Sequence, residues 1–312
     1  MDALIQSLVQ ANFAPERIAP QAPMAQYTTL RIGGPAEVMV NIHSADEIAV
    51  ALRAAKQADA PVTIIGNGSN LLVRDGGIRG LVLRVAGGMN AIRREGDRLI
   101  VEAGASLASV AAFARDEGLC GLAELGGIPG TVGGGVLMNA GAYGAELSQV
   151  VAQVEGIHLA DGRRVSYHAD RLNFSYRHSA LMDTDVVVTQ ATLALAPGDP
   201  EAIRARMEAC ARARREKQPL NLPSAGSTFK RPEGHFAAKL IDDCGLRGLT
   251  VGGAQVSEKH AGFVVNVGGA TARDMLELMR QIEQRVFEQT GVQLEPEVRI
   301  LGADEQKKEE SV

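Results

Sequence analysis

The sequence of 312 residues contains no tryptophan, and aromatic residues make up only 4% of it. No stretch reaches the ~18 uninterrupted apolar residues of a membrane-spanning helix. The N-terminal segment also lacks the basic region of a signal peptide. Basic residues are fewer than acidic ones, 32 against 37, so the net charge is −5. These absences argue against a membrane protein and against a broad surface for nucleic acids or anionic membranes.

Cysteine is scarce as well, with three widely spaced residues at Cys120, Cys210 and Cys244. No C-x-x-C pair is present, which argues against a disulfide framework and against a structural zinc site. The six histidines show no H-x-x-x-H spacing, so no metal site is expected. The composition therefore indicates a globular protein of a reducing compartment, and we expect a cytoplasmic location.

The hydrophobic pattern predicts helices mixed with short strands. Helices are expected in MDALIQSLVQANF at the N-terminus, after the capping-box pattern Ser44–Glu47, from Ser106 to Gly118, from Pro200 to about Lys217 and from Thr271 to Gly291. Strands are expected at 62–65, 81–85, 99–102, 150–159, 164–167, 186–195, 263–267 and 298–301, with a hairpin turn at Asp161-Gly162. The strands gather in the middle of the chain without regular βαβ alternation. This order favours an α+β fold, and the change at 197–200 indicates a domain boundary.

Glycine is abundant, and 14 of the 35 glycines lie in two segments. The first, GNGSNLLVRDGGIRG at 66–80, follows a predicted strand and holds five. Backbone N–H groups of such a loop form a concave anion site that suits a diphosphate. The spacing matches neither a Rossmann turn nor a P-loop. An ordinary glycine-rich turn remains the alternative.

The second segment, residues 121–144, holds nine glycines separated mainly by apolar residues. Because glycine costs roughly 0.5–1 kcal/mol relative to alanine in a regular element, this density favours a backbone that approaches a flat ligand. Ile128, Val132, Val136 and Met138 are candidates for an apolar slot. Asn139, Asn173 or a nearby backbone amide is a candidate for a hydrogen bond to a polar ring edge. A flexible surface loop is the alternative interpretation.

Seven motifs occur in an order that resembles one enzyme family. They are TTLRIGG (28–34), IIGNGSNLLV (64–73), GIPGTVGGGVLMNAGAYG (127–144), FSYRHS (174–179), PSAGSTFKRP (223–232), VSEKHAGFVVN (256–266) and EPEVRILG (295–302). Together they are similar to the UDP-N-acetylenolpyruvoylglucosamine reductases, over about residues 27–302. The compact stretch between Arg177 and Ser227 resembles the shorter form of this family, which lacks a substrate-capping tyrosine loop.

The resemblance implies an α+β fold with an FAD-binding domain of the vanillyl-alcohol-oxidase type in two subdomains, followed by a substrate-binding domain. The expected limits are 1–80, with 299–312 returning to that subdomain, then 81–197 and 198–298. The implied function is NADPH-dependent, FAD-mediated reduction of UDP-N-acetylglucosamine enolpyruvate to UDP-N-acetylmuramate in peptidoglycan precursor synthesis. The FAD is expected to be non-covalent. Another FAD oxidoreductase on the same scaffold, or a non-catalytic flavin-binding protein, remains an alternative.

The resemblance places the FAD pyrophosphate on the first glycine-rich loop, and the flavin and adenosine along the second segment. The residues expected to bind the cofactor are Ile65, Gly66, Asn67, Gly68, Ser69, Asn70, Leu71, Gly127, Ile128, Pro129, Gly130, Val132, Gly133, Gly134, Asn139, Gly141 and Ala142.

Three residues match the catalytic positions of the family. Arg177 carries a permanent charge that can grip the substrate carboxylate, where negative charge develops. Ser227 matches the proton donor, and Glu297 the third position, where a protonated or hydrogen-bond-sharing glutamate would suit the chemistry. Glu295 lies on the same face of an extended strand, so the local pattern alone does not choose between the two glutamates.

A diphosphate in the substrate requires cations, and two basic stretches offer them. Arg212, Arg214, Arg215 and Lys217 lie at a predicted helix end, where basic residues also stabilise the helix dipole. Lys230 and Arg231 follow the predicted catalytic serine. Tyr176, Arg177, Lys217, Ser227 and Arg231 are the candidates for substrate binding. His178 and Ser179 are expected to shape the loop around Arg177.

Overall fold

The computed structural model describes residues 1–305 and divides them into two compact units. Unit 1 comprises residues 1–19, 38–67 and 80–214, and unit 2 comprises residues 20–37, 68–79 and the chain from 215 onward. The predicted domain limits at 80/81 and 197/198 stay predictions. No helix among the described residues is both long and apolar enough to cross a membrane.

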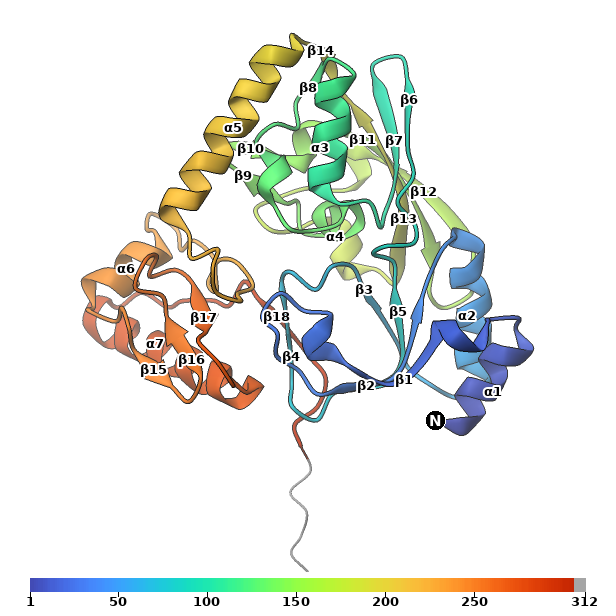
Figure 1. The fold of residues 1–312 in the computed structure, drawn as a ribbon, viewed down its shortest axis with the longest axis horizontal. Coiled ribbons are helices and arrows are strands. Elements are labelled where there is room, and N and C mark those ends of the chain that lie inside the picture. The colour runs from blue at the N-terminus through green and yellow to red at the C-terminus, as the bar shows by residue number, and fades with distance from the viewer. Residues whose placement is uncertain (306–312) are drawn as a thin grey trace, which may run out of the picture. The chain divides into compact units, whose positions relative to one another are not determined.

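Unit 1 is built around a five-stranded antiparallel sheet in the order β12-β11-β13-β7-β6 (Figure 1). The strands are β6 (Ile92–Glu95), β7 (Arg98–Glu102), β11 (Val151–His158), β12 (Arg164–His168) and β13 (Val186–Ala194). The turn at Asp161-Gly162 joins β11 to β12, as the sequence predicts. Gly156 lies beside a register shift in β11, where a Cβ would approach the Val187 carbonyl oxygen to 2.6 Å.

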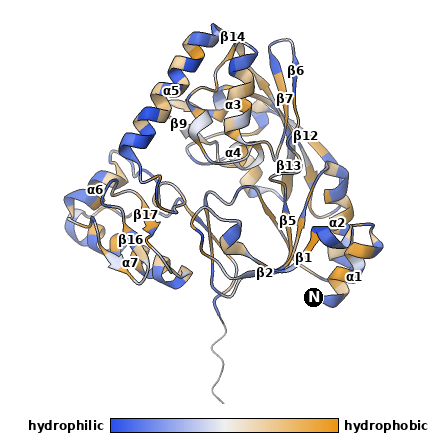
Figure 2. Cartoon of the chain, in the orientation of Figure 1, coloured by the Kyte–Doolittle hydropathy of each residue, from blue (hydrophilic) through white to orange (hydrophobic). Residues whose placement is uncertain are grey.

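The core of unit 1 forms two apolar clusters. One joins the sheet to α3 (Leu107–Asp116) and α4 (Val132–Leu137) through Leu99, Val110 and Val136. The other lies between α1 (Asp2–Gln10), α2 (Ala45–Gln57), β3 (Val62–Ile65) and β5 (Ile78–Arg84), where β3 and β5 pair in parallel. Both helices of this second cluster alternate hydrophobic and hydrophilic residues along their length (Figure 2). A four-stranded sheet runs in the order β1-β2-β5-β3, with β1 at Ile18–Pro23 and β2 at Pro35–Asn41.

Unit 2 has its own core around α7 (Ala272–Thr290). This helix packs against α6 (Ala237–Asp243) and against β15 (Thr250–Val251) and β16 (Ala254–Val256) of a small antiparallel sheet completed by β17 (Val264–Asn266). β18 (Arg299–Leu301) pairs in parallel with β4 (Leu71–Val73). The C-terminal segment thus returns to residues within the first 80 of the chain, while residues 306–312 lie outside the described part.

The remaining elements are short, apart from α5. They are β8 (Leu119–Cys120), β9 (Gly141–Ala142), β10 (Ala145–Glu146), β14 (Ala196–Pro197), and single turns of 3-10 helix at Pro15–Arg17, Met24–Gln26, Leu125–Gly127, Leu147–Gln149, Ala169–Arg171 and Ala180–Asp183. The long helix α5 spans Pro200–Lys217 and is hydrophilic at its C-terminal end (Figure 2). It buries Ile203 and Cys210, whereas Met207 is only partly buried.

The predicted helix caps are present, with one difference. Ser106 and Thr271 accept hydrogen bonds from the amides of Ser109 and Asp274, and Gly291 ends α7 in left-handed backbone. Ser44 accepts from the Glu47 amide, but the reciprocal half of the predicted capping box does not form. The Glu47 carboxylate instead accepts from the His43 amide and pairs with Arg17. The guanidinium of Arg17 holds the pKa of Glu47 below its usual range.

The start of α7 also depends on a residue distant in sequence. The carboxylate of Asp75 accepts hydrogen bonds from the amides of Ala272 (2.8 Å) and Arg273 (3.0 Å). Replacing it with alanine leaves two amides of the first turn without these acceptors, so Asp75→Ala should lower the free energy of unfolding by about 1 kcal/mol. Urea denaturation should show a lower midpoint at an unchanged slope.

The matched control is Asp116→Ala, because Asp116 is exposed and pairs only with its neighbour Arg115. Its effect should stay within about 0.5 kcal/mol. Equal effects of the two substitutions would contradict the capping role of Asp75.

Candidate active site

The first glycine-rich loop begins at the end of β3, where Ile65 is buried. A Cβ on Gly66 would approach Thr131 Oγ1 to 2.4 Å, and one on Gly68 would approach the Tyr27 carbonyl oxygen to 2.1 Å. Gly68 also has a φ of +63°, which disfavours any side chain. Both glycines are therefore required by the packing of the chain itself, whether or not the loop binds an anion.

Within unit 1 this loop is joined to the second glycine-rich segment. The Asn67 side chain donates a hydrogen bond from Nδ2 to the Pro129 carbonyl oxygen at 3.2 Å. Thr131, two residues further on, lies against Gly66. Two segments separated by more than 60 residues, both predicted to contact FAD, thus meet in the same place.

The second segment folds into the short helix α4 rather than a flexible surface loop. Thr131 caps it by accepting a hydrogen bond from the Gly134 amide. A Cβ on Gly133 would lie 2.9 Å from Ala103 Cβ, and one on Gly135 would lie 2.8 Å from Leu147 Cδ1, so both are small because α4 packs closely on its neighbours. Gly134 is exposed, and its Cβ would meet only Thr131 Oγ1 at 3.6 Å. Packing gives no reason for a glycine there, which is consistent with close approach of a flat ligand.

Other predicted cofactor residues have varied surroundings. Gly127 and Pro129 are exposed, Ile128 and Gly130 are half-buried, and Val132 is fully buried in the core. Gly141 and Ala142 form β9, which pairs with β10. Asn139 is buried, and both hydrogens of its amide are bound by Glu146 and by the Ser175 carbonyl oxygen. The cofactor role of this whole set stays a prediction.

Arg214 has a contact that sequence reasoning did not identify. Its guanidinium donates a hydrogen bond to the carbonyl oxygen of Gly127, so α5 contacts the second glycine-rich segment. Burial lowers the pKa of Arg214 relative to its ordinary value, while Tyr143 acts in the opposite direction. Arginine nevertheless remains charged at neutral pH. In the sequence, Arg214 is part of the basic run at the end of α5, a pattern that also indicates a phosphate site.

In unit 2, Thr228 links Ser227, its neighbour in the sequence, to Glu297. This threonine is buried; its amide donates to the Gly262 carbonyl oxygen, and its Oγ1 accepts from the Val264 amide, both at 2.9 Å. Its carbonyl oxygen accepts from the amide of Glu297 at 2.8 Å. Ser227 is thus fixed next to the strand-like segment that carries Glu297.

The two glutamates that the local pattern could not separate have different environments. Glu295 has a side chain that is 69% exposed and pairs with Lys230 at 3.2 Å. Glu297 is half-buried, and its carbonyl oxygen accepts a hydrogen bond from Asn70 Nδ2 at 3.1 Å. Asn70 and the adjoining Ser69 belong to the predicted pyrophosphate loop, and Leu71 pairs with Arg299 in β4–β18. The carbonyl oxygen of Glu295 also accepts from the Lys230 amide at 2.8 Å, so both glutamates have bonded backbone and they differ in the exposure of their side chains.

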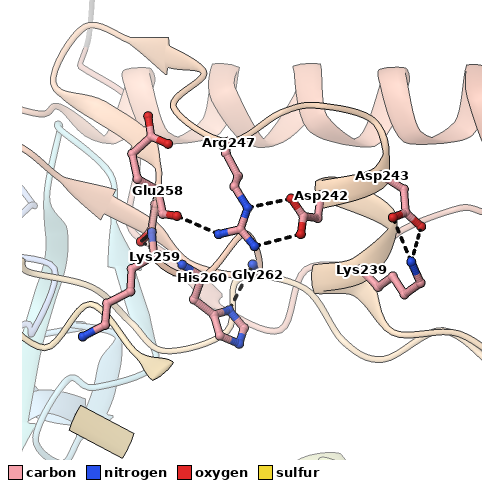
Figure 3. A network of polar contacts seen from close by, with 9 residues as sticks. Lys239, Asp242, Asp243, Arg247, Glu258, Lys259, His260 and Gly262 are labelled. Carbon is pink, nitrogen blue, oxygen red and sulfur yellow. Dashed lines mark hydrogen bonds and ion pairs between the residues drawn. The ribbon is translucent and has the colours of Figure 1, made fainter. Parts of the chain in front are cut away.

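A polar network includes the segment 258–262, whose Gly262 carbonyl oxygen accepts from the Thr228 amide (Figure 3). Asp242 holds Arg247 through two hydrogen bonds, and Arg247 donates to the Glu258 carbonyl oxygen. In the turn that follows, His260 Nδ1 accepts from the Gly262 amide at 3.2 Å, so the neutral ring carries its proton on Nε2. Burial lowers the pKa of His260, and the charge of Arg247 acts in the same direction.

Arg177 belongs to unit 1, at the tip of a tight turn. Ser175 and His178 exchange backbone hydrogen bonds, and Arg177 has a φ of +55°. Its guanidinium lies 5.0 Å from the ring centre of Tyr176. His178 contacts Asp183 and Ser179 donates to the Leu137 carbonyl oxygen, which confirms the prediction that these two residues shape the loop.

The remaining predicted substrate residues are exposed. Lys217 ends α5, and Arg231 of unit 2 stacks on Phe236 with its guanidinium 4.5 Å from the ring centre. The structure groups Ser227 with Glu297, while the joining of Arg177 to them in one site stays a prediction. No cluster of three or more metal-binding side chains occurs within residues 1–305.

Comparison with known proteins defines the class of the chain. Residues 36–167 match the family model of an FAD binding domain, and residues 218–301 match that of the UDP-N-acetylenolpyruvoylglucosamine reductase C-terminal domain. The fold is thus an FAD-binding domain of the vanillyl-alcohol-oxidase type combined with a second α+β domain, as in a flavin-dependent oxidoreductase.

Full-length relatives define the family. The UDP-N-acetylenolpyruvoylglucosamine reductase of Pediococcus pentosaceus is 48% identical over 96% of this chain and 99% of its own length. That of Clostridium novyi is 46% identical over 93% of this chain and 94% of its own length. The crystal structure of the Thermus caldophilus enzyme, 38% identical, superposes with a TM-score of 0.78 over 90% of this chain and 97% of that one. The chain belongs to the UDP-N-acetylenolpyruvoylglucosamine reductase family.

The contrast between Gly133 and Gly134 yields a prediction. Gly134→Ala should leave the apo protein folded, and its higher helix propensity should stabilise it by up to about 1 kcal/mol. Gly134→Leu should lower FAD affinity at least about tenfold, because a side chain would stand where the backbone is expected to meet the cofactor. Titration of apoprotein with FAD, followed by flavin fluorescence, measures the affinity.

Gly133→Ala is the matched control. Its Cβ would press against Ala103, so this variant should lose stability in urea denaturation instead. Undiminished FAD affinity in a folded Gly134→Leu protein would show that α4 does not contact the cofactor.

The environment of His260 predicts a pH dependence of stability. Its pKa is lowered from 6.5 in the folded chain, so below about pH 6.5 the unfolded chain binds more protons at this site. The contribution of His260 is therefore fully present above the unfolded pKa and is lost as the pH falls from there toward the folded pKa.

His260→Asn keeps an acceptor for the Gly262 amide but cannot titrate. The stability of the wild-type protein relative to this variant should decrease between about pH 8 and about pH 5. Urea denaturation at both pH values measures the difference. A constant or growing difference toward acid would show that His260 does not stay neutral in the folded state.

Proposed function

We propose that this chain reduces UDP-N-acetylglucosamine enolpyruvate to UDP-N-acetylmuramate, with FAD as bound cofactor and NADPH as hydride donor. The observation that carries the proposal is the near 50% identity to UDP-N-acetylenolpyruvoylglucosamine reductases over 96% of the chain, which includes both the FAD-binding and the C-terminal domains. Retention of the second domain argues against a non-catalytic flavin-binding module. We further propose a role in peptidoglycan precursor synthesis and a cytoplasmic location.

The donor set of the two glycine-rich segments suits the cofactor. Asn67, Ser69 and Asn70 stand in a loop with glycine in left-handed backbone, where amides and short side chains suit a diphosphate. Gly134 leaves the surface of α4 without a side chain, and Asn67 links the loop to Pro129. When bound there, FAD would supply the hydride chemistry that connects NADPH with C3 of the enolpyruvyl group.

Residues of the chain are then proposed to stabilise the negative charge that develops on the substrate and to transfer a proton to it. Hydride addition at C3 leaves negative charge at C2 that spreads into the substrate carboxylate, and Arg177 is proposed to hold this carboxylate through its guanidinium. Ser227 is proposed to deliver a proton to C2, with its position fixed by the hydrogen bonds of Thr228. Glu297 is proposed to complete the site from the neighbouring segment.

The diphosphate of the substrate requires its own partners. Lys217 and Arg231 are exposed cations that precede and follow Ser227 in the sequence, and Tyr176 lies next to Arg177 in its turn. We propose these residues as substrate contacts. The short chain between Arg177 and Ser227 accords with the family form that lacks a capping tyrosine loop.

Ser227→Ala tests the assignment of the proton donor. The variant should retain FAD and its flavin should still be bleached by NADPH, because both steps precede protonation of C2. Turnover with the UDP-enolpyruvyl sugar should fall by at least about 100-fold. Spectroscopy in the visible flavin band separates the two half-reactions.

The control is Ser109→Ala, an exposed serine near the start of α3, which should leave both half-reactions unchanged. Normal turnover of Ser227→Ala would refute its role. Wild-type protein that oxidises NADPH without any response to the UDP-enolpyruvyl sugar would instead favour another FAD oxidoreductase on this scaffold.

A further inference from the structure

Asn139 is one of the few polar residues that unit 1 buries almost completely, with 1% of its surface exposed. It follows α4 in left-handed backbone with a φ of +42°, a conformation that asparagine tolerates better than most residues. Nδ2 donates to Glu146 Oε2 at 2.9 Å and to the Ser175 carbonyl oxygen at 3.0 Å, and Oδ1 accepts from the Ser148 amide at 2.9 Å. The amide thus ties three places of the chain together.

One of these places is the turn that carries Arg177. The Ser175 carbonyl oxygen accepts two hydrogen bonds, from Asn139 and from the His178 amide across the turn. The other end of the turn is held by Ser179, which is fully buried and donates from Oγ to the Leu137 carbonyl oxygen at 2.8 Å. Both ends of the turn are therefore attached to residues 137–139, at the C-terminal end of α4.

Arg177 itself has a backbone conformation that is unfavourable for arginine. Its φ of +55° lies in the left-handed region, and arginine has no side-chain group near the backbone to offset the cost. Such a conformation persists when the surroundings determine it. The two attachments to residues 137–139 supply these surroundings, since they fix Ser175 and Ser179, which lie two residues before and two residues after Arg177.

We propose that Asn139 is a positioning residue for Arg177, which orients the turn through its hydrogen bond to the Ser175 carbonyl oxygen. This inference rests on the proposed function, in which Arg177 holds the substrate carboxylate. It also couples α4, which is proposed to contact FAD, to the residue that contacts the substrate. A misplacement of a catalytic group by about 1 Å can lower a rate by about 100-fold.

Aspartate is the most informative replacement, because it has the shape of asparagine and tolerates the same backbone. It cannot donate to the Ser175 carbonyl oxygen, and its charge would lie beside the carboxylate of Glu146. In this proposal the side chain of Asn139 is bonded within the chain and does not contact the cofactor, in contrast to the expectation from the sequence, so Asn139→Asp should retain FAD and reduction by NADPH within about twofold of wild type. Its kcat with the UDP-enolpyruvyl sugar should fall at least about tenfold.

Asn12→Asp is the matched control. Asn12 also has left-handed backbone, with a φ of +65°, but it is exposed after α1 and should show wild-type kinetics. Where Asn139→Asp fails to fold, Ser179→Ala provides the second variant, because it removes only the other attachment of the turn. It should likewise lower kcat while FAD stays bound.

A double-mutant cycle distinguishes positioning from a general structural role. If Asn139 acts through Arg177, then adding Asn139→Asp to Arg177→Ala should change kcat less than about twofold further. Fully multiplicative effects would overturn the proposal, since they would show that Asn139 acts independently of Arg177.

Hydrogen exchange separates this inference from the proposed function. The peptide that covers the Ser175–His178 turn should exchange faster in Asn139→Asp than in wild type, whatever substrate the enzyme uses. Wild-type protein that is inactive on the UDP-enolpyruvyl sugar would refute the proposed function, yet faster exchange would still support the role in the turn. Unchanged exchange of this peptide in a folded Asn139→Asp protein would overturn that role.

Discussion

The geometry of the C-terminal unit depends on the three hydrogen bonds of Thr228. An unbonded buried hydroxyl or amide costs roughly 1–3 kcal/mol, and here the amide, Oγ1 and the carbonyl oxygen are all satisfied by the chain. Their partners come from the segment 262–264 and from Glu297, which are far apart in sequence. Ser227 cannot shift without breaking a bond of its neighbour. Ser227, which we propose as the proton donor, is thereby positioned through the hydrogen bonds of Thr228.

Abundant glycine has a different meaning from the one that composition alone indicates. Gly66, Gly68 and Gly133 are close to atoms of the protein, so the chain needs them to bring its own segments together. At Gly134 of α4, packing imposes no such need. Density of glycine therefore marks close approach, but only the surroundings of each residue tell whether the approaching partner is the chain or a ligand.

Local signals account for the part of the fold that the sequence could predict. Ser106, Thr271 and Gly291 mark helix ends through bonds within one turn, and the strands of the large sheet are long enough for their β-branched residues to be evident. Strands β4 and β18 have three residues each and are defined by their pairing partner more than 220 residues away. The Ser44 capping box differs because Arg17, from another element, pairs with Glu47. A prediction from the residues next to Glu47 does not include Arg17, which lies 30 residues away.

The same limit applies to the candidate site. Motif order was sufficient to select Arg177, Ser227 and Glu297, but the local pattern left Glu295 and Glu297 equivalent. They become different because Lys230 pairs with one and Asn70 bonds the carbonyl oxygen of the other.

Asn139 illustrates the limit most clearly. Its place among glycines suggested a ligand contact, whereas its side chain is directed to Ser175, Glu146 and Ser148. A polar residue in a segment that is proposed to bind the cofactor is thus bonded to the turn of Arg177, the residue proposed to hold the substrate carboxylate. The segment that is proposed to contact the cofactor and the turn that carries Arg177 are then parts of one hydrogen-bonded structure, and the buried polar groups that join them have no alternative partner in the solvent.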